Sequence, residues 1–214
     1  TRRRRWEDPP AAFFRGLLDR GSGSTEVTGS TEVACLAADN CAMRSRPSTL
    51  AMERRFVTIL FADIVGSTEL AASYEPEQLR QGLADVFARI SQLLTSHGGT
   101  VEKFIGDAVM AVFGVPQSHD DDAERAIRAA LAVMELARNV ESWVPFPIHF
   151  RIGVNSGEVA TGTGEGGQFL VTGLPVNLAA RFYTAAEPGE ILVGRRPRAL
   201  TSSVVGYGGP RSLP

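Results

Sequence analysis

Two aspartates, each next to an apolar run, are the residues of this sequence that most clearly suggest a metal-binding site. Asp63 ends an apolar run that begins at Phe56, and Asp107 follows Gly106 between two further apolar runs. Carboxylate oxygens are ligands that Mg²⁺ prefers, and the phosphates of a substrate can complete the coordination shell. A lone aspartate at a strand end is more often a turn former or a helix cap. The pair, brought together by neighbouring strands, would instead suit two divalent cations.

A short polar turn follows the first aspartate. Gly66, Ser67 and Thr68 suit a tight exit from a strand and the capped start of a helix, where unpaired backbone N–H groups can hold phosphate oxygens. A second glycine-rich stretch, Gly162 to Gly167, lacks the Gly-Lys-Ser/Thr of a Walker loop. We therefore interpret that stretch as the tip of a hairpin.

Strands and helices that could position these residues are readable from the apolar pattern. The run from Phe56 is nearly continuous and rich in β-formers, which indicates a strand buried on both faces. Gly106-Asp107 predicts a hairpin between strands 100–104 and 108–113. Further strands are expected at 148–154, 158–162, 169–172 and 190–193, with Asn155-Ser156-Gly157 as a turn between the first two.

Three helices are expected between these strands. The first runs from Thr68 to a close at His97, with Pro76 starting or breaking a turn, the second opens at Asp120, and the third runs from Leu174 or Pro175 to Ala186. The order of elements predicts an α+β fold. The nearest architecture is a ferredoxin-like βαββαβ sandwich with a mostly antiparallel sheet and helices on one face.

Composition narrows the class of protein. The 214 residues are 43% hydrophobic and 21% charged, which is enough for one well-buried domain, and the formal net charge of -2 gives no general attraction to nucleic acid or to an anionic membrane. Cys35 and Cys41 make neither a disulfide framework nor a zinc site. We expect a cytoplasmic protein that binds no nucleic acid and no membrane.

The first 51 residues differ in composition and apolar pattern from the rest of the chain. The basic run Arg2 to Arg5 is followed by Trp6, Glu7 and Asp8, and the apolar stretch from Ala11 to Leu18 is interrupted by Arg15. Neither a signal peptide nor a membrane span fits this pattern. We predict that residues 1–51 are disordered or weakly structured.

Four short motifs connect these features. They are Phe61–Thr68 (Phe-Ala-Asp-Ile-Val-Gly-Ser-Thr), Glu102–Asp107 (Glu-Lys-Phe-Ile-Gly-Asp), Arg151–Gly157 (Arg-Ile-Gly-Val-Asn-Ser-Gly), and Val171–Gly173 with Val176–Arg181. In this order they resemble the catalytic domain of class III nucleotidyl cyclases of the bacterial adenylate cyclase type. The resemblance implies a catalytic domain over residues 52–194. Residues 195–214 are expected to be a tail or a truncated part of that domain, and we expect the chain to be a fragment of a longer protein with other regulatory domains.

The resemblance also implies an activity and a site. Adenylate cyclases of this class are lyases that convert ATP to 3′,5′-cyclic AMP and pyrophosphate, by attack of the 3′-hydroxyl on the α-phosphate. By resemblance, two Mg²⁺ or Mn²⁺ ions are held by Asp63, Asp107 and the carbonyl of Ile64. Gly66, Ser67 and Thr68 lie against the triphosphate, and Arg151 reaches the terminal phosphates.

The third predicted helix carries two further residues of the implied site. By resemblance, Asn177 orients the ribose and Arg181 stabilises charge on the α-phosphate in the transition state. They are one helical turn apart and lie on one face, which is equally compatible with an ordinary surface pair. In the family, one subunit provides the aspartates and the other provides this helix. The resemblance therefore implies a head-to-tail homodimer with shared sites.

The base-binding positions follow the family only in part. Lys103 matches the lysine that selects adenine, but its usual Asp or Thr partner falls on Leu170, which offers no side-chain hydrogen bond. Thr172 lies on the same face of that strand and could substitute. Three hypotheses follow: an adenylate cyclase, a degenerate cyclase-like domain that binds nucleotide or regulates a partner by dimerising, and an interaction module with no nucleotide site.

Overall fold

The computed structural model describes residues 52–163 and 169–213. The predicted N-terminal segment 1–51 and most of the glycine-rich tip therefore lie outside the described residues. The chain divides into two units between Thr49 and Leu50, and every described residue belongs to the second unit.

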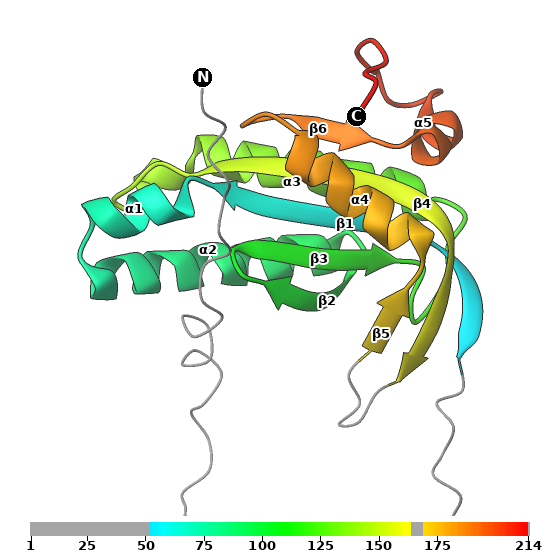
Figure 1. Ribbon diagram of the computed structural model, residues 1–214, viewed down its shortest axis with the longest axis horizontal. Coiled ribbons are helices and arrows are strands. Elements are labelled where there is room, and N and C mark those ends of the chain that lie inside the picture. Colours follow the sequence, from blue (N-terminus) through cyan, green and yellow to red (C-terminus); the bar gives the residue numbers. More distant parts are fainter. Residues whose placement is uncertain (1–51, 164–168, 214) are drawn as a thin grey trace, which may run out of the picture. The chain divides into compact units, whose positions relative to one another are not determined.

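A six-stranded, mostly antiparallel sheet forms the centre of this unit (Figure 1). Its order is β2-β3-β1-β4-β5, and β6 pairs in parallel with β4. The long apolar run becomes the central strand, which pairs with β3 on one side and β4 on the other. The strands are β1 (Glu53–Val65), β2 (Thr100–Ile105), β3 (Ala108–Phe113), β4 (His149–Thr163), β5 (Phe169–Thr172) and β6 (Ile191–Val193).

The helices begin and end close to the predicted signals. Pro76 lies in the first turn of one helix and Pro175 in that of another, where a proline costs no helical hydrogen bond. The expected first helix is divided at Pro76 into two. The helices are α1 (Ser67–Ser73), α2 (Pro76–Ser96), α3 (Asp122–Arg138), the 3₁₀ turn η1 (Val140–Ser142), α4 (Leu174–Ala185) and α5 (Arg195–Thr201).

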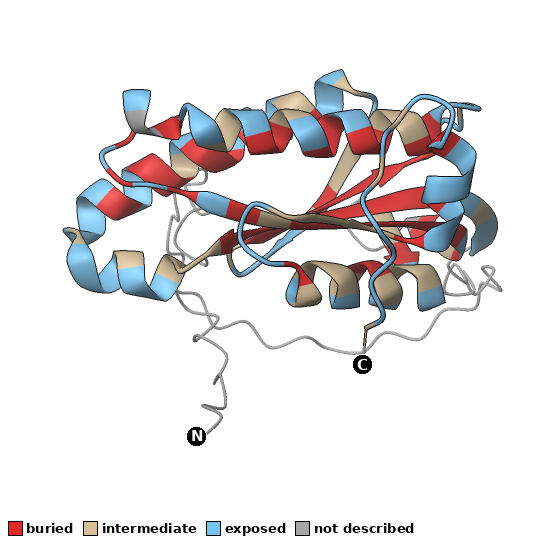
Figure 2. Ribbon diagram, turned by 90° about the horizontal axis from the view of Figure 1, so that it is seen from above, coloured by how far each residue is buried: buried red, intermediate tan, exposed pale blue. Residues whose placement is uncertain are grey.

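The predicted α+β fold is confirmed, with one difference in how the helices are distributed. Helices α2 and α3 lie on one face of the sheet, whereas α4 lies on the opposite face (Figure 2). Phe61 and Met110 share a buried cluster with Ala179 of α4. A Cβ on Gly153 would clash with the backbone of Ala179 and Tyr183, so the glycine lets α4 approach β4 closely. The expectation of helices on one face therefore holds for α2 and α3 and is wrong for α4.

The predicted turn at Asn155-Ser156-Gly157 is wrong, because these residues continue β4. The strand runs without a break for 15 residues and pairs with β1 along its length. The side-chain amide of Asn155 donates to the carbonyl of Pro175 at 3.1 Å, and Gly157 leaves room for the ring of Pro175. Pairing with β1 and packing against α4 thus override the local turn preference.

The segment after β6 folds onto the same unit. Helix α5 packs against β4 and α3, with Pro197 and Thr201 buried. The predicted boundary at residue 194 stays a prediction. Within the described residues, no helix is both long enough and apolar enough to cross a membrane.

Candidate active site

The two aspartates meet where β1 leaves the sheet. Asp63 lies opposite Ala108, the first residue of β3, and Asp107 directly precedes that residue in the hairpin turn. The backbone N–H of Ile64 donates to the carbonyl of Asp107 at 3.3 Å, which ties the end of β1 to the hairpin. The chain therefore brings together the two carboxylates that were far apart in sequence.

Arg151 of β4 is the charge partner of Asp63. The two residues lie opposite each other in the β1–β4 register, and both Nε and Nη2 of Arg151 are 2.6 Å from Oδ2 of Asp63. Only 4% of Asp63 is exposed, while 31% of the Arg151 side chain is. Arg151 therefore pairs with a buried carboxylate while part of its own side chain stays accessible to solvent.

Burial and charge repulsion make the ionised form of Asp63 costly. Burial has the largest effect and the nearby Asp107 adds to it, so that the pKa of Asp63 rises from 3.8 to about 6 although Arg151 acts in the opposite direction. A buried carboxylate that resists ionisation, with a second carboxylate beside it, forms a site where a cation would be stabilising. No cluster of three or more His, Cys, Asp or Glu side chains in the described part of the chain has the geometry of a metal site. A cation here would therefore need backbone, water or phosphate oxygens as further ligands.

We expect the metal-free protein to lose stability as the pH rises from about 4 to about 6. The folded-state pKa of Asp63 is above 3.8, so the folded chain binds more protons than the unfolded chain in this window, and the free energy of unfolding falls with pH. The raised pKa corresponds to at most about 3 kcal/mol. Urea unfolding in EDTA should show this slope for the wild type and a flatter one for Asp63→Asn. Equal slopes would contradict the assignment.

The turn after β1 orients the second aspartate. Gly66 has a φ of 77°, a left-handed conformation that favours glycine, and it precedes the first residue of α1. The following Ser67 donates its hydroxyl to Oδ2 of Asp107 at 2.6 Å. Thr68 is exposed in the first turn of α1. The predicted phosphate-binding turn thus lies directly beside the aspartate pair.

Tyr183 of α4 is a residue that the sequence interpretation missed. Its ring centroid lies 5.3 Å from that of Phe61, and the Arg151 guanidinium carbon lies 5.8 Å from the same ring. Burial and the charge of Asp63 raise the pKa of the Tyr183 phenol. Nothing in its position along α4 distinguishes it from other core-facing residues, because its neighbours come from β1 and β4.

Asn177 and Arg181 lie on the exposed side of α4. Both residues are exposed, whereas Tyr183 faces the sheet beside Asp63. Because successive helix positions are about 100° apart, residues 181 and 183 point in nearly opposite directions. Arg181 borders a separate hollow that it shares with Phe182 and Leu213. One chain thus presents the aspartates and these two polar residues in different directions.

The predicted base-binding residues lie on β2 and β5, which approach each other. Lys103 is partly exposed, and its Nζ is 3.1 Å from Oε1 of Glu102. Val171 belongs to the core cluster, so alternation along β5 directs Leu170 and Thr172 to the other face. Leu170 is partly buried and Thr172 is exposed.

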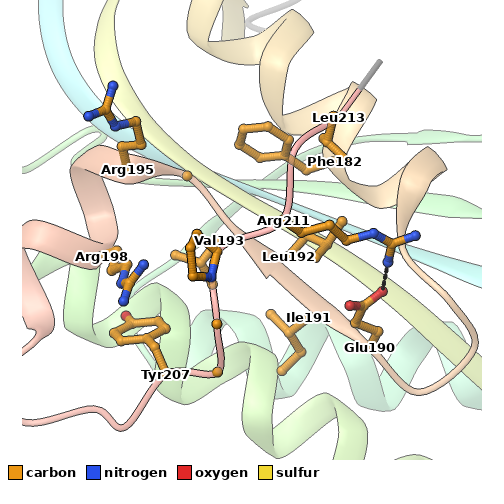
Figure 3. A pocket seen from close by; sticks show the side chains of 14 residues that line it. Phe182, Glu190, Ile191, Leu192, Val193, Arg195, Arg198, Tyr207, Arg211 and Leu213 are labelled. Carbon is orange, nitrogen blue, oxygen red and sulfur yellow. Dashed lines mark hydrogen bonds and ion pairs between the residues drawn. The ribbon is translucent and has the colours of Figure 1, made fainter.

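A pocket of about 400 Å³ lies elsewhere, between β6, α5 and the C-terminal segment (Figure 3). Apolar side chains of Phe182 and of β6 line it, together with Arg198, Tyr207 and an ion pair of 2.9 Å between Arg211 and Glu190. None of the predicted site residues is among the described residues that line it. This pocket of about 400 Å³ is therefore distinct from the site of the two aspartates.

Comparison with known families accounts for the spatial arrangement of the motifs. The model of the adenylate and guanylate cyclase catalytic domain matches residues 51–204. The chain belongs to this family. The resemblance drawn from the four motifs is confirmed, and the matched range of this cyclase domain includes both aspartates, α4 and α5.

The proteins similar to this cyclase domain include both an adenylyl cyclase and a guanylyl cyclase. An uncharacterized protein of Mycobacterium tuberculosis is 36% identical over 150 residues, which are 68% of this chain and 27% of the relative. The chain thus spans about a quarter of the length of such curated relatives. The adenylyl cyclase CyaB from P. aeruginosa is 31% identical, with a TM-score of 0.68 over 72% of this chain and 84% of the other. The guanylyl cyclase Cya2 is 30% identical, with a TM-score of 0.72 over 76% and 86%.

Proposed function

We propose that this domain is an adenylate cyclase that converts ATP to 3′,5′-cyclic AMP and pyrophosphate. The observation that carries the proposal is the pairing of the buried Asp63 with the partly buried Asp107 at the end of β1, with the polar turn of Ser67 beside it. In the reaction, the 3′-hydroxyl of ATP attacks the α-phosphate and pyrophosphate leaves. Membership of the cyclase family supports this reaction class.

The residues present fit a pair of divalent cations. Asp63 and Asp107, with the carbonyl of Ile64, would hold Mg²⁺ or Mn²⁺. The raised pKa of Asp63 supports this proposal, because a nearby cation would stabilise the ionised carboxylate. When bound, the cations would supply Lewis-acid activation of the 3′-hydroxyl and of the α-phosphate. The hydrogen bond from Ser67 orients the Asp107 carboxylate, as outer partners of metal ligands commonly do.

Arg151 has the geometry to serve both the aspartate and the nucleotide. Its Nε and Nη2 lie near Asp63, while the guanidinium has five N–H donors in all. The remaining donors can bind the terminal phosphates, and Ser67 lies beside the neighbouring Asp107. The Tyr183 ring behind the guanidinium restricts its position.

We further propose that two chains assemble head to tail and share two sites. Asn177 and Arg181 are exposed on α4 and point away from the aspartates of their own chain, so they can act on a nucleotide held by a partner. Asn177 would orient the ribose. Arg181 would stabilise charge on the α-phosphate, because arginine stays charged and offers a planar fork of donors.

The nature of the base is the finer part of the proposal. Lys103 is a pure hydrogen-bond donor, which suits the N1 acceptor of adenine. Similarity to both an adenylyl and a guanylyl cyclase leaves the choice of base to experiment. Leu170 favours a second candidate function, a degenerate domain that binds nucleotide without turnover, because it cannot accept a hydrogen bond from the adenine amino group.

We expect the purified chain to form cyclic AMP from ATP with Mn²⁺ or Mg²⁺, and Leu170→Thr to raise the rate about threefold to tenfold. The threonine would supply one hydrogen bond to the base that leucine lacks. Product is measured by chromatography with ATP and, separately, GTP, and Asp63→Ala serves as the inactive control. A preference for GTP would overturn the base assignment, and nucleotide binding without product would favour the degenerate domain.

A further inference from the structure

A buried carboxylate next to Lys103 is unexplained by the fold. The side chain of Glu102 is 1% exposed, and neither of its oxygens accepts a hydrogen bond from the described residues. Its charge partner is Lys103, whose Nζ lies 3.1 Å from Oε1. A buried carboxylate is costly unless it is paired and hydrogen-bonded, so an apolar residue would serve the core better.

A β-bulge places the two side chains together. Val101 pairs with Ala111 and Lys103 pairs with Met110, which leaves Glu102 as the extra residue of β2. In a regular strand, adjacent side chains point to opposite faces, whereas a bulge re-aims one of them. The irregularity in β2 therefore permits an ion pair between neighbours in sequence.

The same register shows where Lys103 points. Met110 pairs with both Lys103 and Phe61, and cross-strand partners share a face of the sheet. Asp63 is two residues from Phe61, so it lies on that face as well. With 37% of its side chain exposed, Lys103 is accessible from the face that carries Asp63.

We propose that Glu102 is a positioning residue that fixes the Lys103 ammonium for recognition of the purine base. The proposal rests on the proposed function, in which Lys103 contacts the base. Lysine has a flexible four-carbon stem and three rotatable donors, so an unrestrained ammonium can reach either N1 of adenine or O6 of guanine. The Glu102 carboxylate holds the ammonium in one place and thereby narrows the choice of base.

The test compares Glu102→Gln, Lys103→Ala and the double variant, with Glu135→Gln as a matched control. Glu135 is an exposed glutamate of α3 paired with Arg138 at 2.7 Å, so its change removes the same charge away from the site. For each variant, KM and kcat are measured with ATP and GTP, nucleotide affinity by calorimetry with Ca²⁺, and melting temperature by calorimetry.

We expect Glu102→Gln to raise KM for the preferred nucleotide about tenfold, with a smaller change in kcat. The ratio of kcat/KM for ATP to kcat/KM for GTP should shift toward one. In the Lys103→Ala background the same change should have no further effect. The melting temperature should stay the same or rise, because a buried charge is removed. Glu102→Asp, which keeps the charge, should recover part of the selectivity.

Two results would overturn the proposal. One is unchanged selectivity and affinity in Glu102→Gln, and the other is an effect that adds fully to that of Lys103→Ala. Calorimetric affinities separate this question from catalysis. If the wild type binds nucleotide but forms no cyclic product, the cyclase proposal fails, while loss of ATP-over-GTP selectivity in Glu102→Gln still supports the role of Glu102.

Discussion

Asp63→Asn should lower cyclic-nucleotide formation by at least about a hundredfold, since loss of even an outer partner of a metal site costs about ten- to a hundredfold. Asparagine keeps the shape of the side chain but removes the charge from a site where Asp63 is 4% exposed and beside Asp107. A neutral amide oxygen binds a divalent cation more weakly than a carboxylate does. The rate is measured with saturating nucleotide and Mn²⁺.

A second readout makes this prediction specific to metal binding. Mn²⁺ should raise the melting temperature of the wild type, because a ligand that binds only the folded state stabilises it, and should have little effect on Asp63→Asn. Asp85→Asn is the matched control, because Asp85 is an exposed aspartate of α2 that accepts a hydrogen bond from Gln81. Retention of more than about a tenth of the activity by Asp63→Asn would contradict a role as metal ligand.

The arrangement around the aspartates was predictable because it depends on local signals. The apolar run of β1 identifies a central strand, and Gly106-Asp107 identifies a hairpin turn. They bring Asp107 back to the end of β1 beside Asp63 on the condition that the hairpin pairs with β1, and the structure has this pairing. The hydrogen bond from Ser67 to Asp107 is consistent with the predicted turn, although its partner could not be read from the sequence.

Features that depend on packing between distant segments were not predictable. Residues Asn155 to Gly157 have the composition of a turn, yet their partners on β1 and α4 keep them extended. The opposite placement of α4 depends on the close approach at Gly153. Periodicity shows which side of a helix is apolar, but it does not show which face of a sheet that side will cover.

The two missed residues differ in the signal that they leave. Tyr183 leaves none, since its importance comes from Phe61 and Arg151 across the sheet. Glu102 leaves a weak signal in the sequence. It is a glutamate next to a lysine, and apolar residues flank the two in the strand. A charged residue at a position that the pattern predicts to be inward-facing is a reason to look for a bulge.

Arg181→Ala should lower turnover about a hundredfold or more while changing nucleotide affinity little. In the proposed mechanism the guanidinium stabilises charge that develops on the α-phosphate, so its loss would affect the transition state more than the bound nucleotide. Steady-state kinetics give kcat, and calorimetry with Ca²⁺ gives affinity. Arg138→Ala, at an exposed arginine of α3, is the matched control. An equal loss in both quantities would assign Arg181 to ground-state binding instead.

Combining the two lesions tests whether sites are shared. Asp63→Asn and Arg181→Ala chains, coexpressed with different tags and purified as a heterodimer, should have about half the activity of the wild-type dimer. One site would join the intact aspartates of one chain to the intact Arg181 of the other, and the second site would carry both lesions.

A heterodimer of Asp63→Asn with Asp107→Asn is the control. It should stay inactive, because each of its two sites then contains one altered aspartate. If the first heterodimer forms and is also inactive, Arg181 does not act across the interface. The exposed position of Arg181 on α4, turned away from Asp63 of its own chain, would then need another explanation.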